Sequence, residues 1–281
     1  MEATNQSVGA ASGGPQAAPA PDEPPDVAPT APEPDGQTAI HEPLFGGDGD
    51  IGVLFCHGFT SSPWSLREWA LTTLAAGYRV SLPRLPGHGT TWRELHATGW
   101  EDWYACVDRE FRVLRRDCRQ VFVAGLSLGG ALALRLAEKH PDDVAGLLLV
   151  NPAVAAANPA AGLAGLLQWV LPSVKSIGSD IAMPGVEEHA YDRTSVKATA
   201  SMLRLWTHIR SCLDLVTCPL LLFRSATDHV VPKASSDFIL SHVSSQDIAE
   251  RVLLRSYHVA TMDYDKQQIF SQSLAFLRDH A

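Results

Sequence analysis

Short apolar runs alternate along this chain with segments in which apolar residues recur at helical spacing. The runs are nearly continuous in Val, Leu and Phe, a pattern typical of strands that are buried on both faces of a parallel sheet. They lie at residues 51–56, 78–82, 120–125, 145–151, 219–225 and 251–255. The pattern therefore predicts a set of parallel strands that begins at Ile51.

Helical segments separate these runs. Leu66, Ala70 and Leu74 fall on one helical face, and Gly77 follows them as a C-terminal cap. Helical patterns also occur at residues 103–114, 131–140 and 270–277. Strands and helices in alternation predict an α/β fold, in which helices flank a mostly parallel central sheet on both sides.

Two segments depart from this alternation. Residues 1–40 consist mainly of Ala, Pro, Gly, Ser and acids, so they cannot bury enough apolar surface to offset the entropy of ordering. We expect a disordered acidic tail there, followed by one domain over residues 41–281. The interval at about 153–210 is expected to form a small cap insertion over the C-terminal edge of the sheet.

The distribution of charge argues against a nucleic-acid partner. The 281-residue chain has a formal net charge of −9. No Lys or Arg precedes Arg67, whereas the first fifty residues hold nine acids, and without these nine the chain has 22 acids against 22 bases. The acidity therefore belongs to the tail, and the body has no net basic charge that would attract a polyanion.

Cysteine usage and the N-terminus favour a cytoplasmic setting. The five cysteines are odd in number, form no C-x-x-C pair and lie among apolar residues, which predicts buried or half-buried reduced thiols. The N-terminus lacks the basic start and apolar stretch of a signal peptide. Asn158, Pro159 and Gln168 interrupt the apolar stretch at 154–171, so no stable membrane insertion is expected. The sequence carries no signal for an oligomeric state.

The strongest chemical signal is a G-x-S-x-G motif between a strand and a helix. The apolar run at 120–125 leads directly into Gly125, Ser127 and Gly129, and a helical pattern follows. Such a nucleophile elbow exposes the serine hydroxyl at the strand tip, beside the N-terminal N–H groups of the helix. A side chain at either glycine would collide with the neighbouring strand or helix. Ser127 is therefore the predicted nucleophile.

A nucleophilic serine needs a base, and in chains with this elbow the acid and the histidine follow it in that order. His258 follows the run at 251–255 by a few residues, at a predicted sheet edge, and is the expected base. Asp228 follows the run at 219–225 and is the expected acid, which would orient the imidazole. We expect His229 to be a surface or packing residue. Solvated or capping carboxylates are expected at the remaining candidate acids, Asp214, Asp237 and Asp263.

The oxyanion hole is assigned to backbone N–H groups. One comes from the residue after the nucleophile, Leu128, and the other from the loop after the first strand, at Phe59. His57 is expected to brace that loop rather than to take part in catalysis. His88 is expected to be a structural loop residue.

These motifs resemble the small bacterial carboxylesterases and monoacylglycerol lipases of the α/β-hydrolase superfamily. The resemblance covers residues 51–281 and is carried by LFCHGFTSSP, LPRLPGHG, GLSLGG, DHVVP and SYHV, in that order. It implies an α/β-hydrolase fold, a triad at Ser127, Asp228 and His258, and oxyanion N–H groups at Phe59 and Leu128. It also implies hydrolysis of short- to medium-chain acyl esters or monoacylglycerols under a small cap. The acidic tail and the Ala-rich cap depart from the family pattern.

The sequence thus predicts a serine hydrolase that cleaves a small-molecule carboxylic ester through an acyl-enzyme and needs no metal or organic cofactor. A thioesterase or an acyltransferase would use the same triad. A non-catalytic binding protein of this fold is the alternative from another class. Apolar residues of the cap are expected either to form an acyl site or to pack against the sheet; they are Leu163, Leu166, Leu167, Trp169 and Val170.

Overall fold

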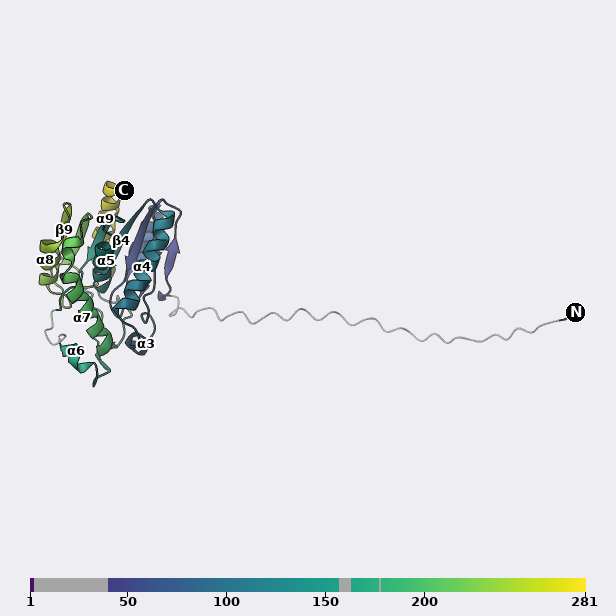
Figure 1. The fold of residues 1–281 in the computed structure, drawn as a ribbon, viewed down its shortest axis with the longest axis horizontal. Coiled ribbons are helices and arrows are strands. Elements are labelled where there is room, and N and C mark those ends of the chain that lie inside the picture. The colour runs from purple at the N-terminus through teal and green to yellow at the C-terminus, as the bar shows by residue number, and fades with distance from the viewer. Residues whose placement is uncertain (3–39, 157–162, 177) are drawn as a thin grey trace. The chain divides into compact units, whose positions relative to one another are not determined.

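The central feature of the computed structural model is a mostly parallel seven-stranded sheet (Figure 1). The structure describes residues 1–2, 40–156, 163–176 and 178–281. The predicted disordered tail therefore lies almost wholly outside the described residues. Apart from Met1 and Glu2, the described residues belong to one unit, Asp35–Ala281.

The sheet has the strand order β1-β3-β2-β4-β5-β8-β9. The short β1 runs antiparallel to β3, and all other neighbours in this sheet are parallel. The strands are β1 (Leu44–Gly46), β2 (Ile51–Cys56), β3 (Arg79–Leu82), β4 (Gln120–Leu126), β5 (Val144–Val150), β8 (Leu220–Ser225) and β9 (Ile248–Leu253).

The apolar runs predicted these strands, with two exceptions at the sheet edges. The edge strand β9 begins at Ile248, before the predicted run at 251–255, and most of its residues are exposed. An edge strand with polar positions such as Glu250 has no continuous apolar run to mark its start. The three-residue β1 was not predicted, because it is too short to show a period.

Apolar layers cover both faces of the sheet, as the continuous runs predicted. Val53 and Phe55 of β2 join a layer with Trp69 and Phe270, whereas the intervening Leu54 joins the opposite layer. The first layer contains residues of α2 (Arg67–Ala75) and α9 (Lys266–His280). The second contains residues of α3 (Trp92–His96), α4 (Trp100–Asp117), α5 (Leu128–Lys139), α7 (Val196–Arg210) and α8 (Lys233–His242).

Short 3₁₀ turns complete the elements around the sheet. They are η1 (Pro63–Leu66), η3 (Leu213–Leu215) and η4 (Ala260–Met262). η1 directly precedes α2, and η4 follows the segment that carries His258. Both turns lie in segments that follow strands of the sheet, where the predicted site residues are found.

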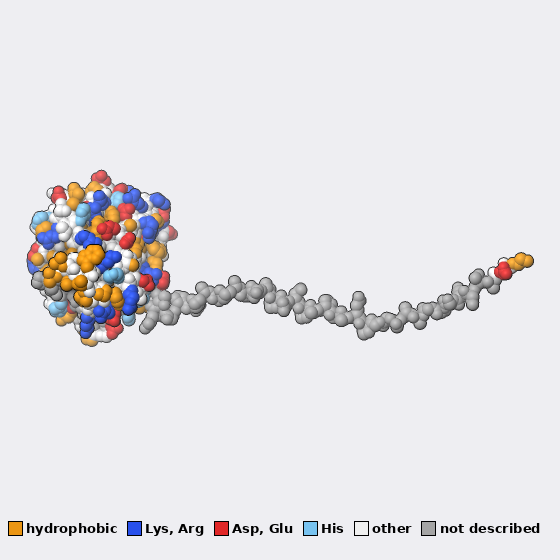
Figure 2. All heavy atoms as spheres, turned by 60° about the horizontal axis from the view of Figure 1, so that its bottom comes forward, with side chains coloured by type: hydrophobic (Ala, Val, Ile, Leu, Met, Phe, Trp, Pro, Cys, Tyr) orange, Lys and Arg blue, Asp and Glu red, His pale blue; other side chains and the backbone are white. Residues whose placement is uncertain are grey.

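A group of small elements lies between β5 and β8. It comprises α6 (Ala164–Leu167), the antiparallel pair β6 (Ser173–Lys175) and β7 (Arg193–Ser195), and then α7. Hydrophobic side chains gather on the face shown in Figure 2. Around α6, Trp169 is 84% exposed and Val170 is 78% exposed, so neither residue packs against the sheet. Of the five apolar cap residues, all of which the structure describes, only Leu167 lines the cavity that Ser127 also lines, so the expected acyl site is supported for Leu167 and not for the other four. Within the described part of the chain, the helices are too short or too polar to cross a bilayer.

Candidate active site

Ser127 occupies a strained turn between β4 and α5. Its φ of 55° and ψ of −115° place a non-glycine residue in a sparsely populated conformation. The Ser127 N–H donates to the carbonyl of Val150 (3.1 Å), and the Ser127 carbonyl accepts from Ala153 (3.1 Å). The chain thus fixes the turn to the neighbouring strand, with the serine side chain at the strand tip.

The two glycines of the motif are required by close backbone contacts. A Cβ on Gly129 would lie 1.8 Å from the carbonyl oxygen of Cys56, and one on Gly125 would lie 2.4 Å from the Gly129 carbonyl carbon. Both distances are far below van der Waals contact. The predicted steric role of these glycines is therefore confirmed.

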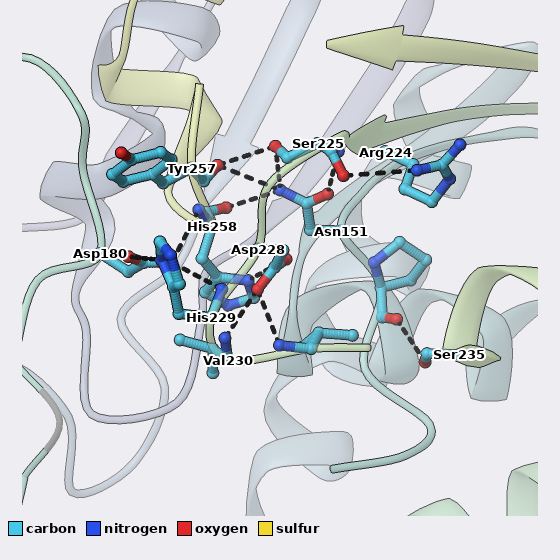
Figure 3. Close-up of polar contacts among 12 residues, drawn as sticks. Asn151, Asp180, Arg224, Ser225, Asp228, His229, Val230, Ser235, Tyr257 and His258 are labelled. Atoms are coloured by element: carbon cyan, nitrogen blue, oxygen red, sulfur yellow. Dashed lines mark hydrogen bonds and ion pairs between the residues drawn. The ribbon is translucent and has the colours of Figure 1, made fainter. Parts of the chain in front are cut away.

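Asp228 and His258 come together across the ends of β8 and β9. The His258 Nδ1 lies 2.8 Å from the Asp228 Oδ2, and both side chains are buried (Figure 3). The Asp228 Oδ1 accepts hydrogen bonds from the backbone of Val230 (2.8 Å) and Val231 (2.7 Å). Burial by itself would raise the pKa of Asp228, but its hydrogen bonds to the ring and to the backbone hold this pKa below its ordinary value.

Ser127 and His258 both line one cavity of about 780 Å³. Among the described residues, no hydrogen bond joins the Ser127 hydroxyl to the His258 ring, although both residues line the wall of this cavity. Hydrogen bonds of this kind often tighten only when substrate is bound. Most of the remaining wall is apolar and includes Phe59, Ala153, Leu167, Val174, Met202, Trp206 and Val231.

The two predicted oxyanion residues flank the serine. Leu128 is the first residue of α5, and backbone N–H groups in a first helical turn have no partner within the helix. Phe59 follows β2 and lines the cavity. No hydrogen bond engages the Phe59 N–H within the described ranges of the chain. Neither N–H group thus has a hydrogen-bond partner among the described residues, and their oxyanion role stays a prediction.

The histidines near the Phe59 loop have structural contacts. His57 is fully buried, its Nε2 accepts from the Leu85 N–H (3.1 Å), and its Nδ1 lies 3.0 Å from the Gly58 carbonyl. Burial holds the pKa of His57 well below its ordinary value, so the ring is neutral and can accept this bond. The predicted bracing role is confirmed. His88 is likewise buried, with its Nδ1 3.0 Å from the Pro86 carbonyl.

Asp180, which sequence reasoning missed, supports the His258 segment from outside the sheet. Its Oδ2 accepts from the backbone N–H groups of His229 (3.1 Å) and His258 (3.2 Å), and its Oδ1 lies 2.8 Å from the His229 Nδ1 (Figure 3). Its backbone carbonyl also accepts from Val259 (3.1 Å). Asp180 lies in a segment without apolar periodicity, so no sequence signal could have found it. His229 is half-exposed, as expected of a surface residue, and also lines the cavity.

Asn151 supports the same segment from the end of β5. Its side-chain nitrogen donates to the His258 carbonyl (2.8 Å), and its side-chain oxygen accepts from the Ser225 N–H (2.8 Å). Asn151 also adopts a positive φ of 44°. The backbone around His258 is therefore held from both β5 and the segment that carries Asp180.

The other acids considered as partners lie elsewhere. Asp237 pairs with Lys233 on the exposed face of α8. Of the two expected roles for Asp263, solvated or capping, the solvated one is wrong, because this residue is fully buried. Its two oxygens accept from the backbone of Ala182, Met183, Tyr257 and Tyr264 at 2.7–3.0 Å. Asp263 thus fastens the segment after β9 to residues near Asp180.

Comparison with known proteins places the chain in a family. Residues 50–265 match the family described as Serine aminopeptidase, S33. A "Thermostable monoacylglycerol lipase" of Bacillus sp. (strain H-257) is 43% identical over 85% of this chain and 95% of its own length. The chain belongs to this α/β-hydrolase family. The predicted fold class is thereby confirmed, and the protein is a serine hydrolase of the monoacylglycerol lipase and carboxylesterase type.

Other relatives agree with this assignment. A "Carboxylesterase" of Bacillus subtilis (strain 168) is 25% identical over 82% of this chain and 93% of its own length. A solved structure described under "LipS and LipT, two metagenome-derived lipolytic enzymes" has a TM-score of 0.83 and 39% identity, covering 85% of this chain and 98% of that one. A Paleococcus ferrophilus monoacylglycerol lipase, 20% identical with a TM-score of 0.73 over 85% of this chain and 100% of that chain, shares the fold.

We expect Asp180→Ala to lower kcat for ester hydrolysis by about 10–100-fold, because displacement of a catalytic group by about 1 Å can have an effect of this size. The substitution removes the acceptor for two backbone N–H groups, including that of His258. Steady-state kinetics would measure the loss. Asp192→Ala, at an exposed acid on the same insertion, is the matched control and should be nearly silent. Equal rates for the two variants would contradict a positioning role for Asp180.

Proposed function

We propose that Ser127, Asp228 and His258 form the triad of an esterase that hydrolyses lipid esters through an acyl-enzyme. The observation that carries this proposal is their arrangement: the elbow serine and a histidine paired with Asp228 open onto one largely apolar cavity. The three residues arrive from the ends of β4, β8 and β9, which lie in the same sheet.

The chemistry follows from this arrangement. The Ser127 Oγ attacks the ester carbonyl carbon while the His258 Nε2 takes the hydroxyl proton, and Asp228 stabilises the resulting imidazolium. The N–H groups of Phe59 and Leu128 receive the negative charge on the carbonyl oxygen. The carbon–oxygen bond to the alcohol then breaks, and His258 returns the proton to the leaving alkoxide. A water molecule, deprotonated by the same ring, releases the carboxylic acid and restores the serine.

The cavity fits an apolar acyl chain beside a polar end. Leu167, Val174, Met202 and Trp206 supply apolar wall. Near the histidine, the wall also contains the carboxyl group of Glu188, which is buried. Burial raises the pKa of Glu188, while the Ser61 hydroxyl and the charge of His258 oppose that rise. Glu188 forms no ion pair with any of the described residues, and a buried carboxyl group of this kind gains from a further hydroxyl donor. We therefore propose that the Glu188 carboxyl group accepts a hydrogen bond from a free hydroxyl of a monoacylglycerol.

We expect Glu188→Gln to lower kcat/KM for a 1-monoacylglycerol by about 10–100-fold, which corresponds to the loss of a hydrogen bond to a charged group. The rate for a p-nitrophenyl ester of the same acyl chain should change little, because this substrate has no glycerol hydroxyls. The neighbouring, exposed Glu187→Gln is the matched control. An equal loss with both substrates would show that Glu188 is not a headgroup residue.

A substrate panel tests the function itself. Monoacylglycerols from acetyl to palmitoyl, their matched thioesters, and each ester with an added alcohol acceptor would be compared with the full chain. Faster turnover of oxygen esters with release of free acid supports the proposal. Preference for thioesters, or transfer of the acyl group to the alcohol, would favour the thioesterase or acyltransferase alternative.

The free thiols of all five cysteines support a cytoplasmic, reducing location for this activity.

A further inference from the structure

A second cluster of reactive side chains lies at the far end of α5 from the serine. Glu138 is in the last turn of α5, His208 is in the last turn of α7, and Cys212 follows α7. One ligand atom from each lies within 4.8 Å of the others. Since α5 rises about 1.5 Å per residue, the eleven residues from Ser127 to Glu138 separate the two clusters by about 16 Å.

Two polar atoms of this cluster are buried without a partner. The Glu138 side chain is 0% exposed, and only its Oε2 is used, by Arg135 at 3.0 Å. Its Oε1 and the His208 Nε2 have no hydrogen-bond partner among the described residues. Burying a polar atom without a hydrogen-bond partner costs free energy of folding. A bound ion or molecule that contacts both atoms would remove this cost.

We propose that Glu138, His208 and Cys212 bind one divalent cation of the zinc class. A carboxylate oxygen, an imidazole nitrogen and a thiolate sulfur are the donor types that Zn²⁺ takes, with a fourth position left for water. His208 lies in the last turn of α7 and Cys212 follows its end, and the ligand atoms of both lie within 4.8 Å of each other and of the Glu138 carboxylate. Zinc–ligand distances of about 2.0–2.3 Å require the three atoms to draw together by about 1 Å, so the half-buried Cys212 side chain, whose Sγ lies 3.7 Å from the Ser211 hydroxyl, would rotate toward the other two ligands.

The charges around the cluster act on a bound cation in both directions. The C-terminal ends of α5 and α7 both point their partial negative charge toward it. Asp214 is close enough to act on Glu138, whereas Arg135 and Lys139 oppose a positive ion. Arg135 is also the residue that holds the second oxygen of Glu138, and the His208 ring stacks on Trp100 at 6.2 Å between centroids. Arg135 thus orients the Glu138 carboxylate and Trp100 orients the His208 ring, the two side chains that would bind the metal.

Binding would fasten the end of α7 to α5. Residues of α7, including Val196, Met202 and Trp206, line the cavity that Ser127 and His258 share. The cation would therefore stabilise one wall of the active-site cavity without contacting the substrate. We expect it to raise the thermal unfolding midpoint, because a ligand that binds only the folded state stabilises it.

The test is equilibrium dialysis of the chelator-stripped full chain against Zn²⁺. We expect one ion per chain and a loss of affinity of at least about tenfold in His208→Ala and in Cys212→Ser. His242→Ala removes a comparable histidine from the last turn of α8 and is the control that should bind as the unmodified chain does. Glu138→Gln, which keeps an acceptor for Arg135, provides a third ligand variant if either of the first two fails to fold.

A spectroscopic readout separates this site from general histidine binding. With Co²⁺ in place of Zn²⁺, the unmodified chain should show a thiolate-to-metal absorption band that Cys212→Ser lacks. A rise in the unfolding midpoint with Zn²⁺ should also disappear in the ligand variants. The proposal is overturned if the chain takes up no Zn²⁺, or if His208→Ala and Cys212→Ser bind it as tightly as the unmodified chain.

Discussion

Ser127→Ala is expected to lower kcat for ester hydrolysis by about 10⁵–10⁶-fold, the size of effect seen when the nucleophile of a serine hydrolase triad is removed. The substitution deletes the Oγ that would bond to the acyl carbon but leaves the turn, which is fixed by backbone hydrogen bonds to Val150 and Ala153. The circular dichroism spectrum should therefore remain native. Covalent labelling by a fluorophosphonate probe should disappear.

The control for this experiment is Ser241→Ala, which removes an exposed serine hydroxyl from α8. It should retain both labelling and turnover. Labelling of the Ser127→Ala variant at the unmodified rate would place the nucleophile at another residue and would remove the basis for the triad.

Asp228→Asn is expected to lower kcat by about 10³–10⁴-fold. The amide can still accept the backbone hydrogen bonds of Val230 and Val231, so the loop should keep its shape. It cannot supply the negative charge that stabilises the imidazolium of His258, which now lies 2.8 Å from a carboxylate oxygen. The loss should therefore appear in kcat, with little change in the unfolding midpoint.

Asp237→Asn is the matched comparison for this substitution. Asp237 is exposed on α8, and its one ion pair among the described residues is with Lys233, one helical turn away; exposed pairs of this kind contribute little. We expect its kcat to equal that of the unmodified chain within about twofold. A larger loss in Asp237→Asn than in Asp228→Asn would reassign the acid.

The parts of the fold that the sequence predicted are those where one requirement dominates. Strands buried on both faces must be apolar throughout, so β2, β4 and β5 stand out as runs of Val, Leu and Phe. The edge strand β9 is mostly exposed and need not be apolar throughout, so the prediction placed its start at residue 251 rather than at Ile248. The elbow was predictable because its motif is short and stands between a strand and a helix, although the contact that enforces Gly129 comes from Cys56 at the end of β2 and only that of Gly125, with Gly129, is local.

The residues of the candidate site that could be predicted are those that directly follow a strand. Asp228 and His258 each follow a strand, and the parallel sheet brings their ends together. Asp180, Asn151 and Glu188 act through contacts with residues far away in the chain, and nothing in their local sequence distinguishes them from surface polar residues. Asp263 shows the same limit, because a buried acid that accepts four backbone N–H groups has the local sequence of a loop.

The hydrogen bonds of Asp180 have a consequence for engineering new specificities. Exchange of the segment between β5 and β8 with that of a relative is the obvious way to alter the acyl cavity. In this protein the exchange would also remove the acceptor for the His258 N–H and the two donors that Ala182 and Met183 give to Asp263. A functional chimera must therefore carry an acid at the Asp180 position, because the segment that lines the acyl cavity also holds the backbone of the catalytic histidine in place.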